Sequence, residues 1–439
     1  MTEIKNFFFK KKILIYGLGK TGISSYYFLK KKNYLYLYDD NFNFIKNKQI
    51  KKSIIKLSKI FKKKFDFILI SPGIDVNNCN LRNFLKKNMS KIITDLDVFY
   101  MNFSNNKNIA ITGTNGKSTT SKLLFDILKT QHMDARLVGN IGNPILAEKK
   151  ITNKTFFVIE ASSYQLEYSQ FFKTNYALIL NISPDHLERH KTFSNYVKSK
   201  LKLVRNQTSK DYSFFNRKDR FIKREISKIK INSKIVNVDI KYYRKKIRKI
   251  KNNYFVTFGN QQNLSFIFAI AEKLKLKNNK LLKSINNFKG LSFRQEIINK
   301  SKKFTLINDS KATSFSSSVN ILKSLTNVFW LVGGIPKKGD RFSLTKKQCK
   351  SIKAYIFGKN KKHFIKNLEK KLKFQTFKNL EEAIKKIIID IKKEKNNEHK
   401  TILFSPSAAS FDSFKNFEDR GKKFNFFIDK FKFKKLIST

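Results

Sequence analysis

The segment that most constrains the fold of this chain is residues 109–120, Ile-Ala-Ile-Thr-Gly-Thr-Asn-Gly-Lys-Ser-Thr-Thr. Residues 109–112 are apolar or β-branched, as in a buried strand. Gly113 and Gly116 then permit a tight turn, and helix formers begin at Ser121. A loop that opens a helix in this way binds anions, because the helix macrodipole and the first backbone N–H groups point at the ligand. The segment predicts an α/β fold with a phosphate-binding loop.

The loop residues indicate a nucleotide. Lys117 can reach the outer phosphates, and a hydroxyl of Ser118 or Thr119 can ligate Mg²⁺. The loop is shortened, since Ile111 stands where the usual phosphate loop has a glycine. A plain glycine turn before a surface helix is the alternative, but it leaves the coincidence of a strand, two glycines, Lys and Ser/Thr unexplained. We expect ATP contacts from Gly113, Thr114, Asn115, Gly116, Lys117, Ser118 and Thr119.

Two further strands are predicted to end in metal-ligating side chains. Residues 156–159 run into Glu160, and residues 176–180 are followed by Asp185 and His186. Carboxylate and imidazole at the carboxyl ends of strands beside a phosphate loop suit one or two Mg²⁺ ions. His186 alone would be read as a structural histidine, and only its combination with the loop favours a functional role.

The length and composition limit the class of protein. A chain of 439 residues with 41% hydrophobic residues is long enough for two to four folded domains. Cys79 and Cys349 are isolated, which excludes a disulfide framework or a zinc ribbon and fits a reducing cytoplasm. No apolar run approaches the roughly 18 residues of a spanning helix. Lysines 10–12 interrupt the apolar N-terminal residues, so we expect no signal peptide.

The formal charge of +61 does not by itself indicate a nucleic-acid-binding protein. The lysines are spread along the whole chain, whereas a nucleic-acid reader concentrates basic residues on one face and contains a recognisable module. We therefore expect small-molecule substrates, no specific nucleic-acid partner and only weak attraction to polyanions at low salt. We also expect a monomer.

The N-terminal region predicts a Rossmann-like nucleotide-binding domain. Strand 13–16 leads into Gly17-Leu-Gly-Lys-Thr-Gly22, strand 34–38 ends at Asp39, and strand 65–70 runs into Ser71-Pro-Gly73. The glycine motif binds a diphosphate through backbone N–H groups and does not distinguish NAD from another nucleotide. A plain glycine-rich turn between a strand and a helix is the alternative.

The remaining strands follow the same alternation with helices. In and beside the lysine-rich stretch 210–251, the only secondary structure predicted is two short strands, at 234–238 and 254–258. Further on, strands are predicted at 304–307, 328–332, 355–357 and 402–404, each followed by polar or glycine-containing loops. Alternating strands and helices predict a second open parallel sheet.

These motifs together resemble the Mur ligases, ATP-dependent amide-forming enzymes of peptidoglycan synthesis. The phosphate loop is shared with folylpolyglutamate synthase, but three motifs resemble the D-glutamate-adding Mur ligases: Asn308-Asp-Ser-Lys-Ala-Thr313, Ser405-Pro406, and Ser410 to Phe417 with Arg420-Gly421. The resemblance implies three α/β domains: a UDP-binding Rossmann-like domain at 1–104, a P-loop-type ATPase domain at 105–290 and an amino-acid-binding domain at 291–439.

The resemblance also implies the site residues. The catalytic residues would be Lys117, His186 and Lys200, and Lys200 would be carbamylated because Tyr196-Val-Lys-Ser-Lys200 matches the family pattern. Two Mg²⁺ ions would be held by Ser118, Glu160, His186 and Lys200. D-glutamate would contact Lys311, Thr313, Ser410 and Phe417. The UDP-substrate would contact Gly19, Lys20, Thr21, Asp39, Ser71, Gly73, Asn140, Ser162 and Gln165.

The chain departs from the family pattern at three places. The family's usual His-Asn pair is replaced by Gln261 and Gln262, and the Asn that follows it by Ser265. A usual histidine is replaced by Phe293, and a customary acidic residue by Ile335. We expect effects on adenine contacts and domain hinging. Two rival functions stay open here. A folylpolyglutamate synthase shares only the phosphate loop, and an NAD-dependent dehydrogenase would leave residues 113–119 unexplained.

Overall fold

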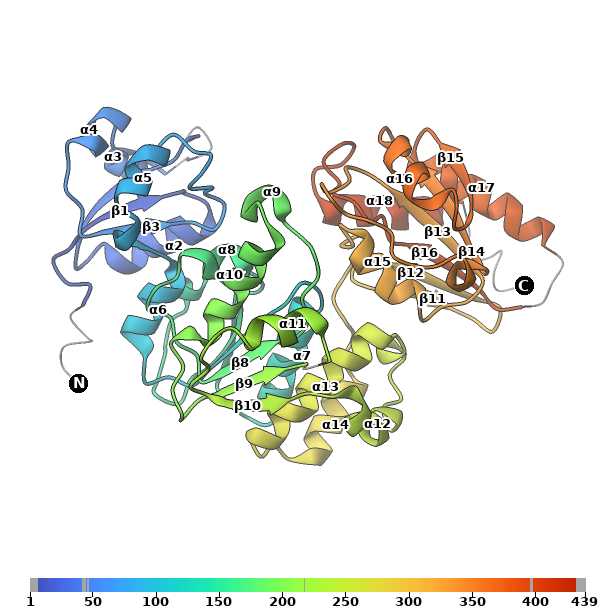
Figure 1. Cartoon of the computed structure of the whole chain (residues 1–439), viewed down its shortest axis with the longest axis horizontal. Coiled ribbons are helices and arrows are strands. Elements are labelled where there is room, and N and C mark those ends of the chain that lie inside the picture. The colour runs from blue at the N-terminus through green and yellow to red at the C-terminus, as the bar shows by residue number, and fades with distance from the viewer. Residues whose placement is uncertain (1–6, 42–44, 46, 217, 395–397, 432–439) are drawn as a thin grey trace. The chain divides into compact units, whose positions relative to one another are not determined.

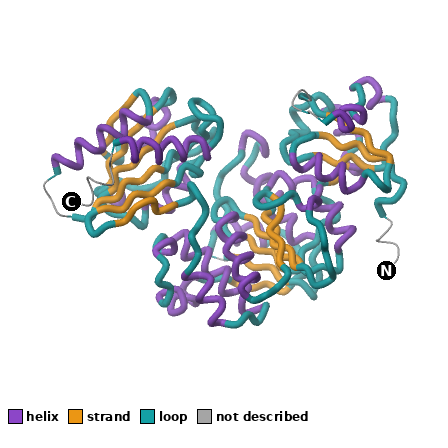
Figure 2. The backbone as a smooth tube through the Cα atoms, turned by 180° about the vertical axis from the view of Figure 1, so that it is seen from behind, coloured by secondary structure: helices purple, strands orange, loops and turns teal. Residues whose placement is uncertain are grey.

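The computed structural model describes residues 7–431 apart from 42–44, 46, 217 and 395–397. In the described residues the strands form three sheets, which lie between helices (Figure 2). The chain divides into two compact units, and each is described by itself. The first consists of Met1–Ile182, Ser194–Asp239 and Ala269–Leu281, and the second of Ser183–Phe193, Ile240–Phe268 and Leu282–Thr439.

The first sheet lies near the N-terminus and is entirely parallel, in the order β2-β1-β3-β4 (Figure 1). Helix α2 (Lys20–Leu29) starts directly after β1 and packs close against its end. A Cβ at Gly22 would lie 1.9 Å from the carbonyl oxygen of Gly17, so only glycine fits this turn. The strands are β1 (Lys12–Tyr16), β2 (Tyr34–Tyr38), β3 (Phe67–Ile70) and β4 (Ile92–Ile93).

The second sheet has the order β10-β9-β8-β5-β7-β6, and all its strands are parallel. Every residue of the central strand β5 is buried. Because parallel strands end at one edge of a sheet, the loops after β5, β7 and β8 converge there. The strands are β5 (Asn108–Thr112), β6 (Ala135–Gly139), β7 (Phe156–Glu160), β8 (Tyr176–Ile179), β9 (Tyr212–Phe215) and β10 (Lys234–Asn237).

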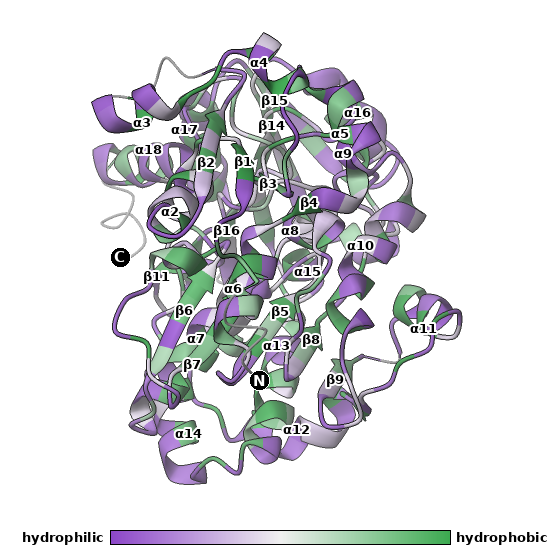
Figure 3. Cartoon of the chain, turned by 90° about the vertical axis from the view of Figure 1, so that its left-hand side faces the viewer, coloured by the Kyte–Doolittle hydropathy of each residue, from purple (hydrophilic) through white to green (hydrophobic). Residues whose placement is uncertain are grey.

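The third sheet belongs to the second unit and has the order β11-β12-β16-β13-β14-β15. Only β11 runs antiparallel to its neighbour. Apolar side chains cover both faces, one around Trp330 and the other around Phe404. In Figure 3 the hydrophobic colouring of strands is seen most clearly on β5 and β8 of the second sheet. The strands are β11 (Glu296–Lys300), β12 (Phe304–Asn308), β13 (Val328–Gly333), β14 (Ile352–Phe357), β15 (Lys373–Phe377) and β16 (Lys400–Phe404).

The helices connect and cover these strands, and none in the part of the chain that the structure describes is long and apolar enough to cross a membrane. Besides α2 they are α3 (Lys48–Ser53), α4 (Leu57–Phe61), α5 (Arg82–Lys87), η1 (Met89–Lys91), α6 (Asp95–Phe103), α7 (Lys117–Thr130), η2 (Ile145–Ala147), α8 (Ser163–Tyr168), α9 (Leu187–His190), α10 (Phe193–Arg205), α11 (Arg220–Ile226), α12 (Ile240–Arg248), η3 (Asn253–Phe255), α13 (Phe258–Lys273), α14 (Asn278–Asn286), α15 (Phe315–Leu322), η4 (Lys347–Cys349), α16 (Lys361–Leu368), α17 (Leu380–Lys393) and α18 (Phe417–Lys430).

Most predicted strands are confirmed within two or three residues, but the strand at 254–258 is wrong. That segment is the 3₁₀ turn η3 followed by the start of α13. The side chain of Asn252 accepts a hydrogen bond from the backbone N–H of Tyr254 at 2.9 Å, which starts a turn despite the aromatic and β-branched sequence. Helix α7 also begins at Lys117, before the predicted helix formers, and the lysine-rich stretch contains the unpredicted α11 and α12.

Candidate active site

The phosphate-binding loop lies between β5 and α7, as predicted, and is held from the neighbouring strand. The backbone N–H of Thr114 donates to the carbonyl oxygen of Asn181, which follows β8, at 2.9 Å. The side chain of Asn181 also accepts from the N–H of Asn115 at 2.9 Å and donates to its carbonyl oxygen at 3.0 Å. Gly113 and Gly116 have φ of 155° and 85°, and Gly116 is the N-cap of α7. These contacts fix the conformation of the loop at the N-terminus of α7, which is the kind of position where anions bind.

Lys117 is the first residue of α7, and its side chain folds back over the loop. Its Nζ donates to the carbonyl oxygens of Gly113 at 2.8 Å and Thr114 at 2.9 Å. The ammonium group is thus held above the turn where a phosphate would lie. Ser118 and Thr119 follow in the same helical turn and are buried.

Lys200 on α10 contacts the same loop. Its Nζ donates to the carbonyl oxygen of Gly113 at 2.9 Å and lies 4.6 Å from the ring centroid of Tyr196. The Tyr196 hydroxyl lies 3.0 Å from Oγ1 of Thr114. Only 1% of Lys200 is exposed, whereas the nearby Lys198 is exposed to solvent. Burial therefore distinguishes Lys200 from the many surface lysines, as the sequence alone did not.

Glu160 ends β7 beside the strand that leads into the loop, and its register partner on β5 is Ile111. Its Oε1 accepts from Nδ2 of Asn140 at 2.8 Å, and the N–H of Asn140 donates to its carbonyl oxygen at 2.9 Å. Its Oε2 is buried and has no hydrogen-bond partner among the described residues. A buried carboxylate oxygen without a donor fits a cation ligand. The structure thus brings Glu160 and Asn140 together.

Ser162 and Gln165 form the start of helix α8. The Ser162 hydroxyl accepts from the N–H of Gln165 at 3.2 Å, and Oε1 of Gln165 accepts from the N–H of Ser162 at 3.2 Å, which is a capping box. The amide of Gln165 also donates to Asp95 on α6 at 3.4 Å. Burial raises the pKa of Asp95 to about 6, against the hydrogen bond from Gln165. Both predicted substrate residues thus have a structural role in the first unit.

His186 lies in the second unit, with carboxylates on both sides of its ring. Its Nε2 is 3.4 Å from Oδ2 of Asp185, and its Nδ1 is 3.4 Å from Oε1 of Glu188. The hydrogen bond from His186 lowers the pKa of Glu188. The φ of His186 is 53°, a strained backbone conformation of the kind found at functional sites. In the described residues no group of three or more His, Cys, Asp or Glu side chains is arranged to hold a metal, so the metal role of His186 stays a prediction.

The glycine turn of the first sheet is held by two predicted residues. The N–H of Leu18 donates to Oδ2 of Asp39 at 2.6 Å, and the Ser71 hydroxyl donates to the carbonyl oxygen of Gly17 at 2.6 Å. A Cβ at Gly19 or Gly73 would have no atom within 4 Å beyond the adjacent residues, so the space beside both glycines is open. Lys20 is exposed and Thr21 is partly exposed at the start of α2.

The predicted amino-acid residues come from loops that follow β12 and β16. The Nζ of Lys311 lies 4.0 Å from the ring centroid of Phe417, the first residue of α18. Ser410 is buried directly after Ala409, whose N–H and carbonyl oxygen pair with Ile335 at 2.9 Å. Thr313 lies two residues after Lys311 in the same loop. The structure thus brings Lys311 and Phe417 together, with Ser410 on a loop joined to the glycine turn after β13.

Arg420 connects these loops and was not predicted as a site residue. Its side chain is fully buried and donates to Oγ of Ser310 at 3.2 Å and to the carbonyl oxygen of Ser310 at 2.7 Å. Burial lowers the pKa of Arg420 to about 10. Asn181 was missed as well, and so was Lys337, whose Nζ forms an ion pair with Asp185 inside the second unit. The signals in the sequence were the glycine-containing motifs around Arg420 and Lys337 and the position of Asn181 just after a strand.

Phe293, which stands where the family usually has a histidine, packs against helix α18. A Cβ at Gly421 would lie 2.3 Å from the Phe293 ring, so the ring packs directly on this glycine of α18. The carbonyl oxygen of Phe293 accepts from the N–H of Lys311 at 3.0 Å. Phe293 therefore supports the loop that carries Lys311. Gln261 and Ser265 lie within α13, where the Ser265 hydroxyl donates to the carbonyl oxygen of Gln261 at 3.1 Å.

Asp309 is a buried carboxyl group beneath the same loops. Its Oδ2 accepts from the Ser405 hydroxyl at 2.9 Å, and its Oδ1 accepts from the N–H of Gln295 at 3.1 Å. Burial raises the pKa of Asp309 to about 7, although the Ser405 hydrogen bond and the charges of Arg294 and Arg420 act in the opposite direction.

Replacing Asp309 with asparagine is expected to flatten the pH dependence of stability. The pKa rises from 3.8 in the unfolded chain to about 7 in the folded one, so the stabilising contribution is complete at low pH and is lost as the pH rises through about 7. As the pH rises from about 5.5 to about 8.5, the ionisation of Asp309 should lower the free energy of unfolding by about 2 kcal/mol. The neutral asparagine does not ionise and should cause no such change. Denaturant unfolding at both pH values measures the difference. The same loss in both proteins would contradict the prediction.

Comparisons with known proteins agree with this arrangement. A family model described as the Mur ligase middle domain matches residues 111–300, and one described as the N-terminal domain of MurD-like Mur ligases matches residues 11–93. The UDP-N-acetylmuramoylalanine–D-glutamate ligase of Rickettsia felis is 35% identical over 94% of this chain and 96% of that protein. The protein of the same name from Rickettsia prowazekii is 36% identical, over 95% and 98%.

This chain belongs to the Mur ligase family. It is therefore an ATP-dependent ligase of the amide-forming kind. A more distant relative, the enzyme of the same name from Francisella tularensis subsp. novicida, is 34% identical over 82% of this Mur ligase and 84% of that protein.

Solved structures show the same fold at low sequence identity. The UDP-N-acetylmuramate-alanine ligase MurC of Thermotoga maritima has a TM-score of 0.51 and 16% identity, covering 96% of this Mur ligase and 99% of that chain. The MurF ligase of the same organism, solved in complex with ADP, has a TM-score of 0.55 and 12% identity, covering 85% and 90%. The predicted α/β fold with parallel sheets is thus confirmed.

Proposed function

We propose that this Mur ligase joins D-glutamate to UDP-N-acetylmuramoyl-L-alanine and converts ATP to ADP and phosphate. The observation that carries the proposal is the 35% identity to a ligase of that name over nearly the whole of both chains. The Asn308–Thr313 loop supports it, because Lys311 lies against Phe417 and has a cationic group for a substrate carboxylate. A folylpolyglutamate synthase is not favoured, and an NAD-dependent dehydrogenase leaves the phosphate loop without a role.

The chemistry divides into two transfers. A carboxylate oxygen of the muramoyl-alanine attacks the γ-phosphorus of ATP, the bond to the β-phosphate oxygen breaks, and ADP leaves. The acyl phosphate then has a good leaving group. The D-glutamate nitrogen attacks its carbonyl carbon, loses a proton, and the tetrahedral intermediate expels phosphate to leave the amide. Lys117 offsets the negative charge that develops on the transferring phosphoryl group.

The residues around the loop fit Mg²⁺. Glu160 has a buried oxygen without a partner among the described residues, and the Ser118 hydroxyl lies in the first turn of α7. With His186 and a carbamylated Lys200 they would hold two ions. Bound Mg²⁺ would supply further positive charge to the phosphoryl oxygens. The hydrogen bond from Lys200 to the carbonyl oxygen of Gly113 in the loop supports the assignment of this lysine.

The first sheet would bind the UDP part of the substrate. The Gly17–Gly22 turn would lie against the diphosphate through Gly19, Lys20 and Thr21. Asp39, Ser71 and Gly73 would complete the pocket. In the central domain, the substrate would contact Asn140, Ser162 and Gln165. We assign domains to residues 1–104, 105–290 and 291–439. The enzyme would act as a monomer in the cytoplasm, where ATP is available.

The proposal is tested by measuring phosphate release with UDP-N-acetylmuramoyl-L-alanine, ATP and a panel of amino acids. D-glutamate should support release, and L-glutamate, L-lysine and diaminopimelate should not. A folate acceptor with L-glutamate should be inactive. A higher rate with L-lysine would contradict the proposed specificity, and activity with the folate would support the alternative enzyme.

Replacing Lys311 with alanine is expected to raise the KM for D-glutamate about tenfold or more, because one charged contact to a carboxylate is lost. Binding of the UDP-substrate should be unchanged. The matched control is Lys323→Ala, which removes an exposed lysine at the end of α15. Steady-state kinetics with D-glutamate as the varied substrate make the comparison. An unchanged KM in the Lys311 variant would remove Lys311 from the amino-acid site.

A further inference from the structure

A cavity of about 590 Å³ lies at the amino ends of the strands in the third sheet. Its walls include Lys353 at the start of β14, Lys373 at the start of β15 and Lys400 at the start of β16. The loops with Lys311 and Ser410 follow the carboxyl ends of strands in the same sheet. Since a strand rises about 3.3 Å per residue, strands of five or six residues separate the two edges by about 17–20 Å. The cavity is therefore distinct from the proposed amino-acid site.

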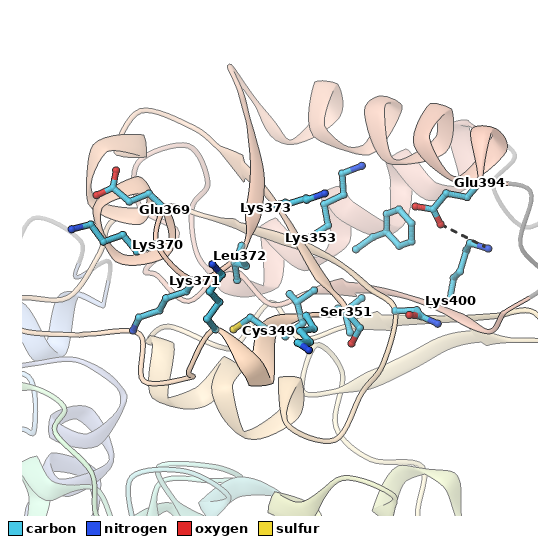
Figure 4. A pocket seen from close by; sticks show the side chains of 16 residues that line it. Cys349, Ser351, Lys353, Glu369, Lys370, Lys371, Leu372, Lys373, Glu394 and Lys400 are labelled. Carbon is cyan, nitrogen blue, oxygen red and sulfur yellow. Dashed lines mark ion pairs between the residues drawn. The ribbon is translucent and has the colours of Figure 1, made fainter.

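The lining of the cavity is unusually basic. Seven of its sixteen residues are lysines and two are glutamates, an excess of five positive charges. In the whole chain, 93 of 439 residues are Lys or Arg, so the lining has about twice the average share of basic residues. Figure 4 shows Lys370 and Lys371 at one end of the cavity and the Glu394–Lys400 ion pair at the other, with Lys353 and Lys373 between them.

Only part of this charge is neutralised by the protein. Lys353 pairs with Asp390 at 2.9 Å and Lys400 with Glu394 at 3.9 Å. Four other lysines form no ion pair with any residue that the structure describes; they are Lys346, Lys350, Lys370 and Lys373.

The ends of the neighbouring helices account for only part of this cluster, namely Lys370 and Lys371, which follow the C-terminal end of α16. The negative end of a helix dipole attracts cations only within the last turn, whereas Lys353, Lys373 and Lys400 lie on strands. A concave surface with like charges focuses their field on the space inside, which favours an anion there.

The lining also indicates the kind of anion. It contains no arginine, the residue that binds planar carboxylates through two hydrogen bonds, whereas lysine binds phosphate as a point charge. The volume is in the range of small-molecule sites, roughly 300–1,000 Å³, and Val328, Phe329 and Ile352 provide apolar surface. We propose that this cavity is an accessory binding site for a small molecule that carries several phosphate groups.

The test is calorimetric titration of the full chain with inorganic tripolyphosphate at physiological ionic strength. The Lys117→Ala background is used to weaken competition from the phosphate loop. The cavity variant is Lys350→Gln with Lys373→Gln, two exposed lysines whose replacement leaves the described ion pairs intact. The matched control is Lys362→Gln with Lys366→Gln, which removes the same charge from exposed positions of α16.

The proposal predicts one equivalent of bound tripolyphosphate, with a Kd at least tenfold higher in the cavity variant and changed less than twofold in the control. Citrate should bind at least tenfold more weakly than tripolyphosphate. ATP binding that is tighter than that of tripolyphosphate and at least tenfold weaker in the cavity variant would identify a nucleotide as the natural ligand of the cavity. Equal binding of the two, weakened to the same extent in the cavity variant, would identify an inorganic chain. No binding, equal weakening in both variants, or citrate binding as tight as tripolyphosphate would overturn the proposal.

Discussion

Replacing Lys117 with alanine is expected to lower kcat about a thousandfold, because the ammonium group that offsets the charge of the transferring phosphoryl is lost. The Nζ of Lys117 is already held over the loop by the carbonyl oxygens of Gly113 and Thr114. The loop itself is fixed mainly by Asn181, so the fold should survive the change. Phosphate release by the purified variant measures the effect.

The matched control for Lys117 is Lys129→Ala, an exposed lysine in the last turn of the same helix α7. This variant should retain normal turnover, and both variants should melt within a few degrees of the native chain. Near-normal turnover of a folded Lys117→Ala variant would remove residues 113–119 from the ATP site.

The second large effect is expected at Lys200. Replacement by alanine should lower turnover roughly a hundredfold or more, because the proposed carbamate would be an anionic ligand for Mg²⁺. Lys200 is buried and bonded to the loop at Gly113, which limits its contacts to the interior of the site. A small carboxylic acid added to the assay should restore part of the activity, since it replaces the missing anion. Removal of bicarbonate or a lower pH should reduce the activity of the native enzyme, because a carbamate forms from CO₂ and a neutral amine.

Lys198→Ala is the matched control for Lys200. Lys198 is exposed, lies two positions earlier in α10 and hence on a different face of the helix, so this variant should be active. An inactive Lys198 variant with an active Lys200 variant would mean that the family pattern beginning at Tyr196 has been matched to the wrong lysine. Normal activity of both would exclude a carbamate at this position.

The parallel strands were predictable because buried strands are short apolar runs that end in glycine or polar residues. The segments 34–38 and 109–112 illustrate this, since both correspond to β2 and β5 nearly residue for residue. Residues 254–258 have the same composition, yet Asn252 caps a turn there and the chain enters α13. The capping side chain of Asn252 thus favours a turn in a segment whose composition favours a strand. The antiparallel edge strand β11 was missed because its residues are only partly buried and lack an apolar run.

The candidate site was predictable where a motif is continuous in sequence. The phosphate loop and the Lys311 loop lie directly after strands, and Glu160 is the last residue of a strand. Such positions indicate function. Residues whose role depends on contacts between distant segments were missed. Asn181 contacts Asn115 across 66 positions, and Arg420 contacts Ser310 across 110 positions. The spacing of residues within a short sequence motif cannot predict such contacts.

The reaction itself tests the central claim most directly. The purified chain is incubated with UDP-N-acetylmuramoyl-L-alanine, D-glutamate and ATP, and the products are identified by mass spectrometry alongside ADP and phosphate. We predict a UDP-muramoyl dipeptide whose mass is the sum of the two substrates less one water, formed with one ADP and one phosphate per product. Formation of the corresponding product from L-lysine but not from D-glutamate, or ATP hydrolysis without any joined product, would contradict the proposed function.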